Sequence, residues 1–187
     1  MSNYDKEYKT ENFFGNPYPE LIEFFKTYKT KAKLLDLGCG QGRDAIPLAR
    51  LGFCVTAIDL SEVGIKQIRE AVDREGLNII SKIEDIYKYD SFEEFDFILL
   101  DSILHFYKKD RETETGLVKK IINSSKKGTI IVVCIQDSGE KVKILLDTIN
   151  STNKAKLIEQ KSFKFKWIDK DSDHKSFSKY QMLAIEK

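Results

Sequence analysis

The stretch LLDLGCGQGRD, residues 34–44, decides the fold of this chain. It begins with an apolar run that contains one acid, continues with three glycines at alternate positions, and leads into a helical pattern. This order predicts a buried strand, a tight turn and a helix, because glycine adopts the positive-φ conformations that tight turns need. Free N–H groups at a helix N-terminus bind anionic or polar ligand groups. We therefore predict a ligand-binding turn at residues 38–42. The alternative is an ordinary strand-to-helix loop without a binding function.

Acidic residues close the apolar runs that follow this turn. Asp59 ends the next run, and Asp85 and Asp101 follow two later ones. A single acid in such a place is often part of a turn. In open α/β sheets, however, ligands bind beyond the carboxyl ends of the parallel strands. Because these three acids and Asp36 would meet at one sheet edge, beside the glycine turn, they predict a ligand site there.

Alternating strand and helix patterns cover the rest of the chain. Apolar runs predict strands at residues 33–37, 53–58, 77–83, 95–100 and 129–135. Helical spacing and capping residues predict helices after Pro17 and Pro19, at 42–51, from Ser61 to Gly76, around Leu117 and Ile121, and after Ser138 as a candidate cap. Period-two alternation at residues 163–167 and 180–184 predicts a final antiparallel pair of strands.

Length and composition favour one globular unit. With 187 residues the chain can bury a substantial core as a single domain, residues 1–187. A net charge of +1 supplies no global field for nucleic acid or membrane. Three widely spaced cysteines indicate reduced thiols, and no Cys/His cluster has zinc-ligand spacing. The polar N-terminus and the shortness of the apolar runs predict a cytoplasmic protein, without metal and without a membrane segment.

Asp-x-Gly-x-Gly-x-Gly after a strand, with an acid at the end of the next strand, resembles class I S-adenosylmethionine (SAM)-dependent methyltransferases. It is not the dinucleotide fingerprint Gly-x-Gly-x-x-Gly, because Arg43 stands where the third glycine would be. The segments GRDA (42–45), FCVTAIDLS (53–61) and LHF (104–106) resemble most the small-molecule methyltransferases of the tellurite-resistance and thiopurine group. The resemblance extends from about residue 4 to the C-terminus.

The resemblance implies a Rossmann-like, doubly wound α/β sheet of seven strands. Most strands would be parallel, with helices on both faces and an antiparallel last strand inserted between the fifth and the sixth. The aromatic-rich start of the chain has two interpretations, a segment packed on the domain surface or a cover over the site. Class I enzymes for small molecules often fold this segment over the site, so we treat residues 1–30 as an N-terminal cover segment and helix.

The resemblance also implies SAM as the cofactor and gives roles to the residues at the sheet edge. Gly38 and Gly40 would line its methionine part, while Asp36 would bind the ammonium group directly or through water. Asp59 would accept hydrogen bonds from the ribose hydroxyls, since a carboxylate presents two oxygens to two vicinal donors. Arg43 has two equally weighted interpretations, contact with the cofactor carboxylate or an ion pair with a neighbouring acid.

At the other end of the cofactor, Leu60 and Ile86 would enclose the adenine, and Asp85 would accept from its amine. Asp101 would lie close to the methionine part and the methyl group. The complete set expected to bind the cofactor is Asp36, Gly38, Cys39, Gly40, Gln41, Gly42, Arg43, Asp59, Leu60, Asp85, Ile86 and Asp101.

Methyl transfer from a sulfonium depends mainly on alignment, and a base is needed only if the acceptor must lose a proton. His105, in the apolar turn after the fourth strand, is the candidate base; more often a histidine in such a place is hydrogen-bonded structure. The residues expected near the acceptor are Tyr8, Phe14, Trp167 and His174. For His174 a solvated hairpin turn is the favoured alternative.

The expected acceptor is a small molecule. Residues 101–104 read DSIL, so the Asn/Asp-Pro-Pro-Tyr/Phe motif of amino-methylating nucleic-acid enzymes is absent after the fourth strand. Three alternatives are a non-catalytic SAM-binding or partner-binding module on the same fold, a nicotinamide-dependent enzyme, and a nucleic-acid methyltransferase that uses the lysine-rich residues 154–187. The chain is expected to be a monomer or a homodimer.

Overall fold

The computed structural model describes residues 4–28, 32–168 and 175–187. These residues form a sheet of seven strands in the order β3-β2-β1-β4-β5-β7-β6. The strands are β1 (Lys33–Leu37), β2 (Cys54–Asp59), β3 (Ile79–Ile83), β4 (Phe97–Asp101), β5 (Ile130–Gln136), β6 (Lys156–Ile168) and β7 (Lys175–Glu186). The α-helices are α1 (Pro19–Lys26), α2 (Ala45–Arg50), α3 (Glu62–Glu75), α4 (Arg111–Ser124) and α5 (Lys141–Thr152), with short 3₁₀ helices η1 (Glu7–Lys9) and η2 (Phe92–Glu94).

The strand directions confirm the expected topology. The first five strands are parallel, and β7 pairs antiparallel with both β5 and β6. The last strand in sequence therefore lies between the fifth and the sixth, as the resemblance implied. All the parallel strands end at one edge of the sheet, the edge at which a ligand site is expected.

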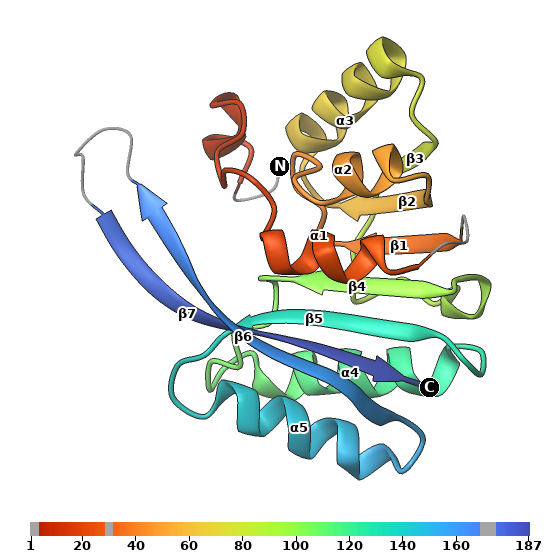
Figure 1. Cartoon of the computed structure of the whole chain (residues 1–187), viewed down its shortest axis with the longest axis vertical. Helices are drawn as coiled ribbons and strands as arrows, with labels where there is room; N and C mark the ends of the chain where they lie inside the picture. Colours follow the sequence, from red (N-terminus) through yellow and green to blue (C-terminus); the bar gives the residue numbers. More distant parts are fainter. Residues whose placement is uncertain (1–3, 29–31, 169–174) are drawn as a thin grey trace.

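Helices cover both faces of the sheet (Figure 1). The helices α1, α2 and α3 pack on one face, and α4 and α5 pack on the other. Strand residues alternate between the two cores: Leu34 belongs to the first and Leu35 to the second. Apolar residues on both sides of each central strand explain why these strands read as continuous apolar runs in the sequence.

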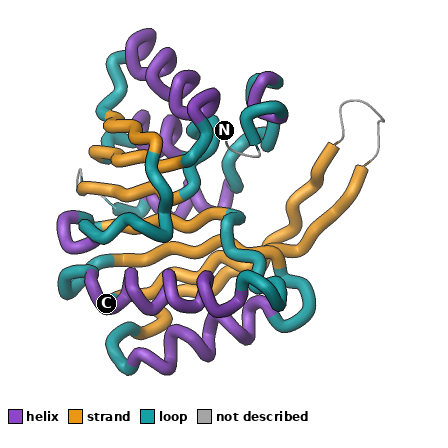
Figure 2. The backbone as a smooth tube through the Cα atoms, turned by 180° about the vertical axis from the view of Figure 1, so that it is seen from behind, coloured by secondary structure: helices purple, strands orange, loops and turns teal. Residues whose placement is uncertain are grey.

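The β6–β7 hairpin is longer than the sheet that supports it. Pairing of β7 with β5 ends at Tyr180, opposite Gln136, whereas its pairing with β6 continues to Lys175, opposite Ile168. The outer part of the hairpin therefore projects beyond the sheet as an arm (Figures 1 and 2). It projects on the side of the carboxyl ends of the parallel strands, where the N-terminal segment also lies.

Several element boundaries differ from those expected. The helix predicted at 42–51 begins only at Ala45, and Asp44 is its N-cap residue. The helix α5 begins at Lys141 with Glu140 at the N-cap, and the prediction that Ser138 caps it is wrong. Ser61 is confirmed as the cap of α3, because its hydroxyl accepts a hydrogen bond of 3.0 Å from the N–H of Gly64.

Candidate functional site

A cavity of about 880 Å³ lies at the carboxyl edge of the sheet. The glycine turn forms its floor, the N-terminal segment (residues 4–16) covers it, and residues of the β6–β7 arm close one end. Its volume is in the upper range of small-molecule sites, which measure about 300–1,000 Å³. Residues predicted for the site that line this cavity are Tyr8, Phe14, Gly38, Cys39, Gly40, Gln41, Gly42, Arg43, Asp59, Asp101 and His105.

The glycine turn is closely packed on two sides. Gly38 and Gly40 have φ values of +74° and +52°, which favour glycine. A Cβ on Gly40 would lie 2.6 Å from the Tyr8 hydroxyl, and one on Gly38 would lie 2.6 Å from the Cγ2 of Ile103. The backbone of both glycines still lines the cavity. The turn therefore needs glycine for its own packing as well as for the approach of a ligand.

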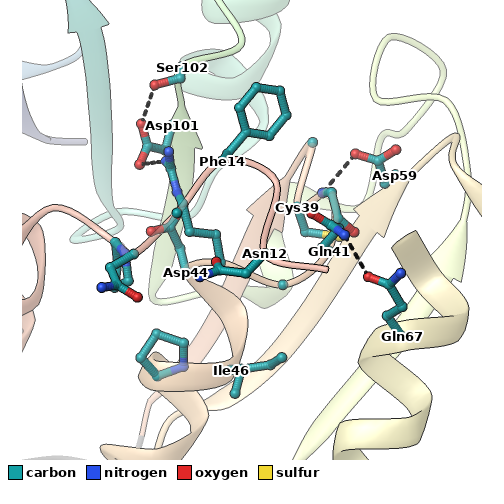
Figure 3. Close-up of a pocket in the computed structure, with 18 of the residues that line it drawn as sticks. Asn12, Phe14, Cys39, Gln41, Asp44, Ile46, Asp59, Gln67, Asp101 and Ser102 are labelled. Carbon is teal, nitrogen blue, oxygen red and sulfur yellow. Dashed lines mark hydrogen bonds and ion pairs between the residues drawn. The ribbon is translucent and has the colours of Figure 1, made fainter. Parts of the chain in front are cut away.

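Asp59 joins the end of β2 to the glycine turn. Its Oδ2 accepts a hydrogen bond of 2.9 Å from the N–H of Gly40, and its Oδ1 accepts one of 2.8 Å from the N–H of Ser61. The carboxylate lines the cavity (Figure 3). Since a carboxylate has about four acceptor positions, two remain for hydroxyl donors of a ligand. The position of Asp59 agrees with the ribose-binding role that the resemblance implied.

A group of buried charges lies at the other end of the glycine turn. The Arg43 guanidinium donates to Asp44 Oδ2, at 3.2 Å from Nε and 3.1 Å from Nη2, and makes a short contact with Asp101. Asp101 also accepts a hydrogen bond of 2.8 Å from the Ser102 hydroxyl (Figure 3). Of the two interpretations of Arg43, the ion pair with neighbouring acids is thus observed in the structure, and the guanidinium lines the cavity as well.

Asp36 is the third acid of this group. It is 2% exposed, and its Oδ2 has no hydrogen-bond partner; the same is true of Oδ1 of Asp44. The Arg43 guanidinium pairs with Asp44 and Asp101, whereas no ion pair joins it to Asp36 among the described residues. Burial, and then the neighbouring Asp44, raise the pKa of Asp101 to about 8, and burial raises the pKa of Asp36 well above its usual range. The group can therefore hold a proton at neutral pH, and Asp44, which lines the cavity, keeps one oxygen without a partner.

This acidic group predicts a specific pH dependence of stability. The raised pKa values mean that the folded state binds more protons than the unfolded state between about pH 4 and pH 8, so stability falls as the pH rises through this window. We expect Asp36→Asn to reduce this loss by about 1 kcal/mol or more between pH 5 and pH 8. Urea unfolding at both pH values measures it, with Asp147→Asn on the surface of α5 as the control. An equal loss in wild type and Asp36→Asn would contradict the prediction.

Two glutamine side chains attach the N-terminal segment to the glycine turn and α3. The Nε2 of Gln41 lies 2.9 Å from the carbonyl oxygen of Thr10 and 2.8 Å from Oε1 of Gln67, and its Oε1 accepts a hydrogen bond of 2.8 Å from the N–H of Phe13. The Nε2 of Gln67 donates to the carbonyl of Tyr8 at 2.7 Å. Gln41 lines the cavity, and its predicted role at the cofactor stays a prediction. Its observed hydrogen bonds hold the segment that covers the cavity, and Figure 3 shows the one to Gln67.

Aromatic residues surround the end of the cavity near Asp101. The Tyr18 ring contacts Phe165 and Tyr180, with centroid distances of 5.0 and 5.1 Å, and the Arg43 guanidinium lies 4.8 Å from its centre. The Tyr18 hydroxyl is 3.0 Å from the Ser102 hydroxyl. His105 lines the same cavity. This end combines apolar walls with a few polar groups, as is typical of small-molecule sites.

Asp36 and the three residues predicted for the adenine lie outside the cavity lining. Leu60 is half exposed, Ile86 packs against the second core, and Asp85 accepts a hydrogen bond from the N–H of Tyr87 within its own loop. Their roles at the adenine stay predictions. Trp167 lies in β6, opposite Ser176 of β7. His174 falls outside the described residues.

Residues that sequence reasoning missed contribute much of the cavity. Tyr18 stands between two prolines, a pattern that indicates only the start of a helix, and its partner Ser102 is distant in the sequence. Gln67 occupies a polar position on a helix and carries no motif. Ser102 could have been suspected from its place directly after Asp101.

No helix in residues 4–28, 32–168 and 175–187 combines the length and apolar composition that a membrane span requires. Within the same part of the chain, no group of three or more His, Cys, Asp or Glu side chains is arranged to hold a metal ion.

Comparison with known sequences gives a family match. The family model described as "Tellurite resistance protein TehB" matches residues 2–161. A "Probable S-adenosyl-L-methionine-dependent methyltransferase TehB" of Haemophilus influenzae is 32% identical over 126 residues, which are 67% of this chain and 40% of that protein. A "2-heptyl-1-hydroxyquinolin-4(1H)-one methyltransferase" of Mycobacteroides abscessus is 25% identical over 124 residues, 66% of this chain and 54% of that protein. The chain thus spans about half of these relatives' length or less.

Solved structures share the fold. The crystal structure of TehB from Haemophilus influenzae has a TM-score of 0.74 at 22% identity and covers 98% of this chain and 65% of that one. A magnesium protoporphyrin IX methyltransferase from Synechocystis PCC 6803, solved with bound SAM, has a TM-score of 0.69 at 14% identity and covers 90% of this chain and 77% of that one. At these identities the likeness establishes the class I methyltransferase fold.

Proposed function

Because this chain belongs to the tellurite resistance protein TehB family, we propose that it is a SAM-dependent methyltransferase that acts on a small-molecule acceptor. The observation that carries the proposal is Asp59, whose carboxylate is fixed to the N–H of Gly40 at 2.9 Å and lines the cavity beside the glycine turn. The fold and the names of the similar proteins support the same activity.

The residues that line the cavity suit the ribose and the methionine part of SAM. Asp59 would bind the ribose hydroxyls, and the backbone of Gly38 and Gly40 would line the methionine part. The unpartnered Oδ1 of Asp44 offers an acceptor for the ammonium group. When bound, SAM supplies an activated methyl group on a positively charged sulfur. The carboxylates of Asp44 and Asp101 would then lie beside a cationic ligand, which favours its binding.

At the acceptor end, the chain's own residues would align the nucleophile and exclude water. Tyr18, Phe165 and Tyr180 form an apolar wall, which suits a small, partly apolar acceptor. His105, which lines the cavity, would take a proton from a hydroxyl or thiol acceptor. The hydroxyquinolinone named for the Mycobacteroides abscessus relative is an acceptor of this type. A cytoplasmic location and a monomeric or homodimeric state remain proposals from the sequence.

A turnover assay tests the proposal. The chain is incubated with SAM and a panel of thiols, phenols, amines, and tellurite and selenite, and S-adenosylhomocysteine (SAH) and the methylated product are detected by mass spectrometry. We expect acceptor-dependent SAH formation with at least one small molecule. Binding of SAM without turnover would support the non-catalytic alternative, and turnover only with RNA or DNA would support the nucleic-acid alternative.

A further inference from the structure

Glu114 is a buried acid that the proposed reaction does not use. It lies in the first turns of α4, and its residue is only 3% exposed. Its carboxylate accepts hydrogen bonds from two successive backbone N–H groups: that of His105, at 3.1 Å from each oxygen, and that of Phe106, in a short contact with Oε2. A buried charge is retained in a protein only when such partners compensate its desolvation.

The loop that Glu114 holds is residues 102–106, between β4 and the chain leading to α4. Ser102 and Phe106 have φ values of +60° and +50°, in the left-handed region that non-glycine residues rarely adopt. Such backbone persists only where its surroundings hold it in place. At the first end, the N–H of Ser102 donates to the carbonyl of Cys134 at 2.9 Å. At the second end, Glu114 supplies the restraint.

This loop carries side chains into the cavity. Ser102, Ile103 and His105 all line it, and Ile103 packs directly on Gly38 of the glycine turn. The His105 imidazole stacks on the ring of Tyr107, with centroids 5.5 Å apart and an interplanar angle of 23°. The hydrogen bonds that His105 makes come from its backbone N–H. Among the described residues, neither imidazole nitrogen has a hydrogen-bond partner. The imidazole is therefore placed by the backbone and by Tyr107.

We propose that Glu114 is the positioning residue of the acceptor site. Its carboxylate fixes the backbone at His105 and Phe106, and thereby sets where the imidazole meets the methyl acceptor. This inference rests on the proposed function of His105 as the base. It adds a residue that lies outside the cavity lining and acts only through the loop it holds.

A double-mutant cycle tests the proposal. In Glu114→Ala we expect kcat/KM for the acceptor to fall by about 10–100-fold, since small misplacements of a reacting group cost this much. The Kd of SAM should stay within about twofold, because the glycine turn and Asp59 are untouched. Glu114→Gln should recover part of the rate, since its amide oxygen can still accept. The control is Glu112→Gln, an exposed acid in the same helix, which should behave as wild type.

The cycle is completed in a His105→Ala background. If Glu114 acts through the imidazole, Glu114→Ala should change the remaining rate by less than about twofold there. A purely structural Glu114 would lower the melting temperature and the yield but leave kcat per folded molecule unchanged, or would give additive losses in the double variant. Either result would overturn the proposal.

An NMR measurement separates failure of this proposal from failure of the proposed function. In the wild type, the Tyr107 ring should shift the imidazole resonances of His105 through the stacking contact. We expect this shift to be lost in Glu114→Ala and kept in Glu112→Gln, whether or not an acceptor is turned over. Retention of the shift in Glu114→Ala would show that the carboxylate does not position the imidazole.

Discussion

Replacement of Gly64 by alanine is expected to destabilise the fold more than replacement of any other glycine at the site by alanine. A Cβ at Gly64 would lie 2.4 Å from the carbonyl oxygen and 2.8 Å from the carbonyl carbon of Gly40. Both are backbone atoms of the glycine turn, so either α3 or the turn must move. We expect a loss of about 2–3 kcal/mol in the free energy of unfolding, as for overpacked cores. Urea unfolding, followed by circular dichroism, measures it.

Gly116→Ala is the matched control for this prediction. Gly116 also lies within a helix, but a Cβ there would have no neighbour within 4 Å. Alanine is favoured over glycine in helices, so the control should gain about 0.5–1 kcal/mol of stability. If Gly64→Ala were as stable as Gly116→Ala, the close packing of α3 on the glycine turn would be refuted.

Replacement of Asp59 by alanine should weaken SAM binding by about 10–100-fold, because each hydrogen bond to a charged acceptor contributes about 1.5–3 kcal/mol. The substitution removes the proposed ribose acceptor. It also frees the N–H groups of Gly40 and Ser61, which Asp59 now accepts from. Isothermal titration calorimetry with SAH provides the affinity, and unfolding curves provide the stability.

Asp147→Ala serves as the control for Asp59→Ala. Asp147 is an exposed acid on α5 that pairs with Lys143, far from the glycine turn in the sequence. The Asp147→Ala variant should bind SAH with the same affinity as the wild type. Wild-type affinity in a folded Asp59→Ala variant would rule out the ribose-binding role of this carboxylate.

The local pattern around the glycine turn predicted the fold well, because each of its features has a local physical cause. The strand, the turn and the Ser61 cap follow from apolar periodicity, from positive-φ glycines and from side-chain capping. The order of the strands in the sheet could not be predicted from these local features. Periodicity does not contain it, and it came from the resemblance to known methyltransferases.

The cavity was only partly predictable, because its residues depend on contacts between distant segments. Alternation along β1 places Asp36 on the face opposite Leu35, beneath the turn, so its carboxylate is buried with the other acids and does not line the cavity. Glu114 resembles any acid near a helix start, where acids favour the helix dipole. Only the folded chain shows that it is buried against the loop at His105.

Gly64 illustrates the same limit. Glycine within a helix lowers the local helix propensity, and the sequence gives no reason for it. The reason is the carbonyl group of Gly40, which passes too close for any side chain. The segment at residues 4–16 is similar: its aromatic residues have no strict period, and its position is set by Gln41 and Gln67, which attach it to the turn and α3.

Calorimetric titration of the unmodified chain with SAH tests the central claim most directly. The claim is that the cavity between the glycine turn and Asp59 holds the nucleoside cofactor of methyl transfer. We predict one site with a Kd in the micromolar range, which corresponds to about 8 kcal/mol of binding free energy. Absence of binding heat with both SAH and SAM, together with an unchanged melting temperature at millimolar ligand, would contradict it.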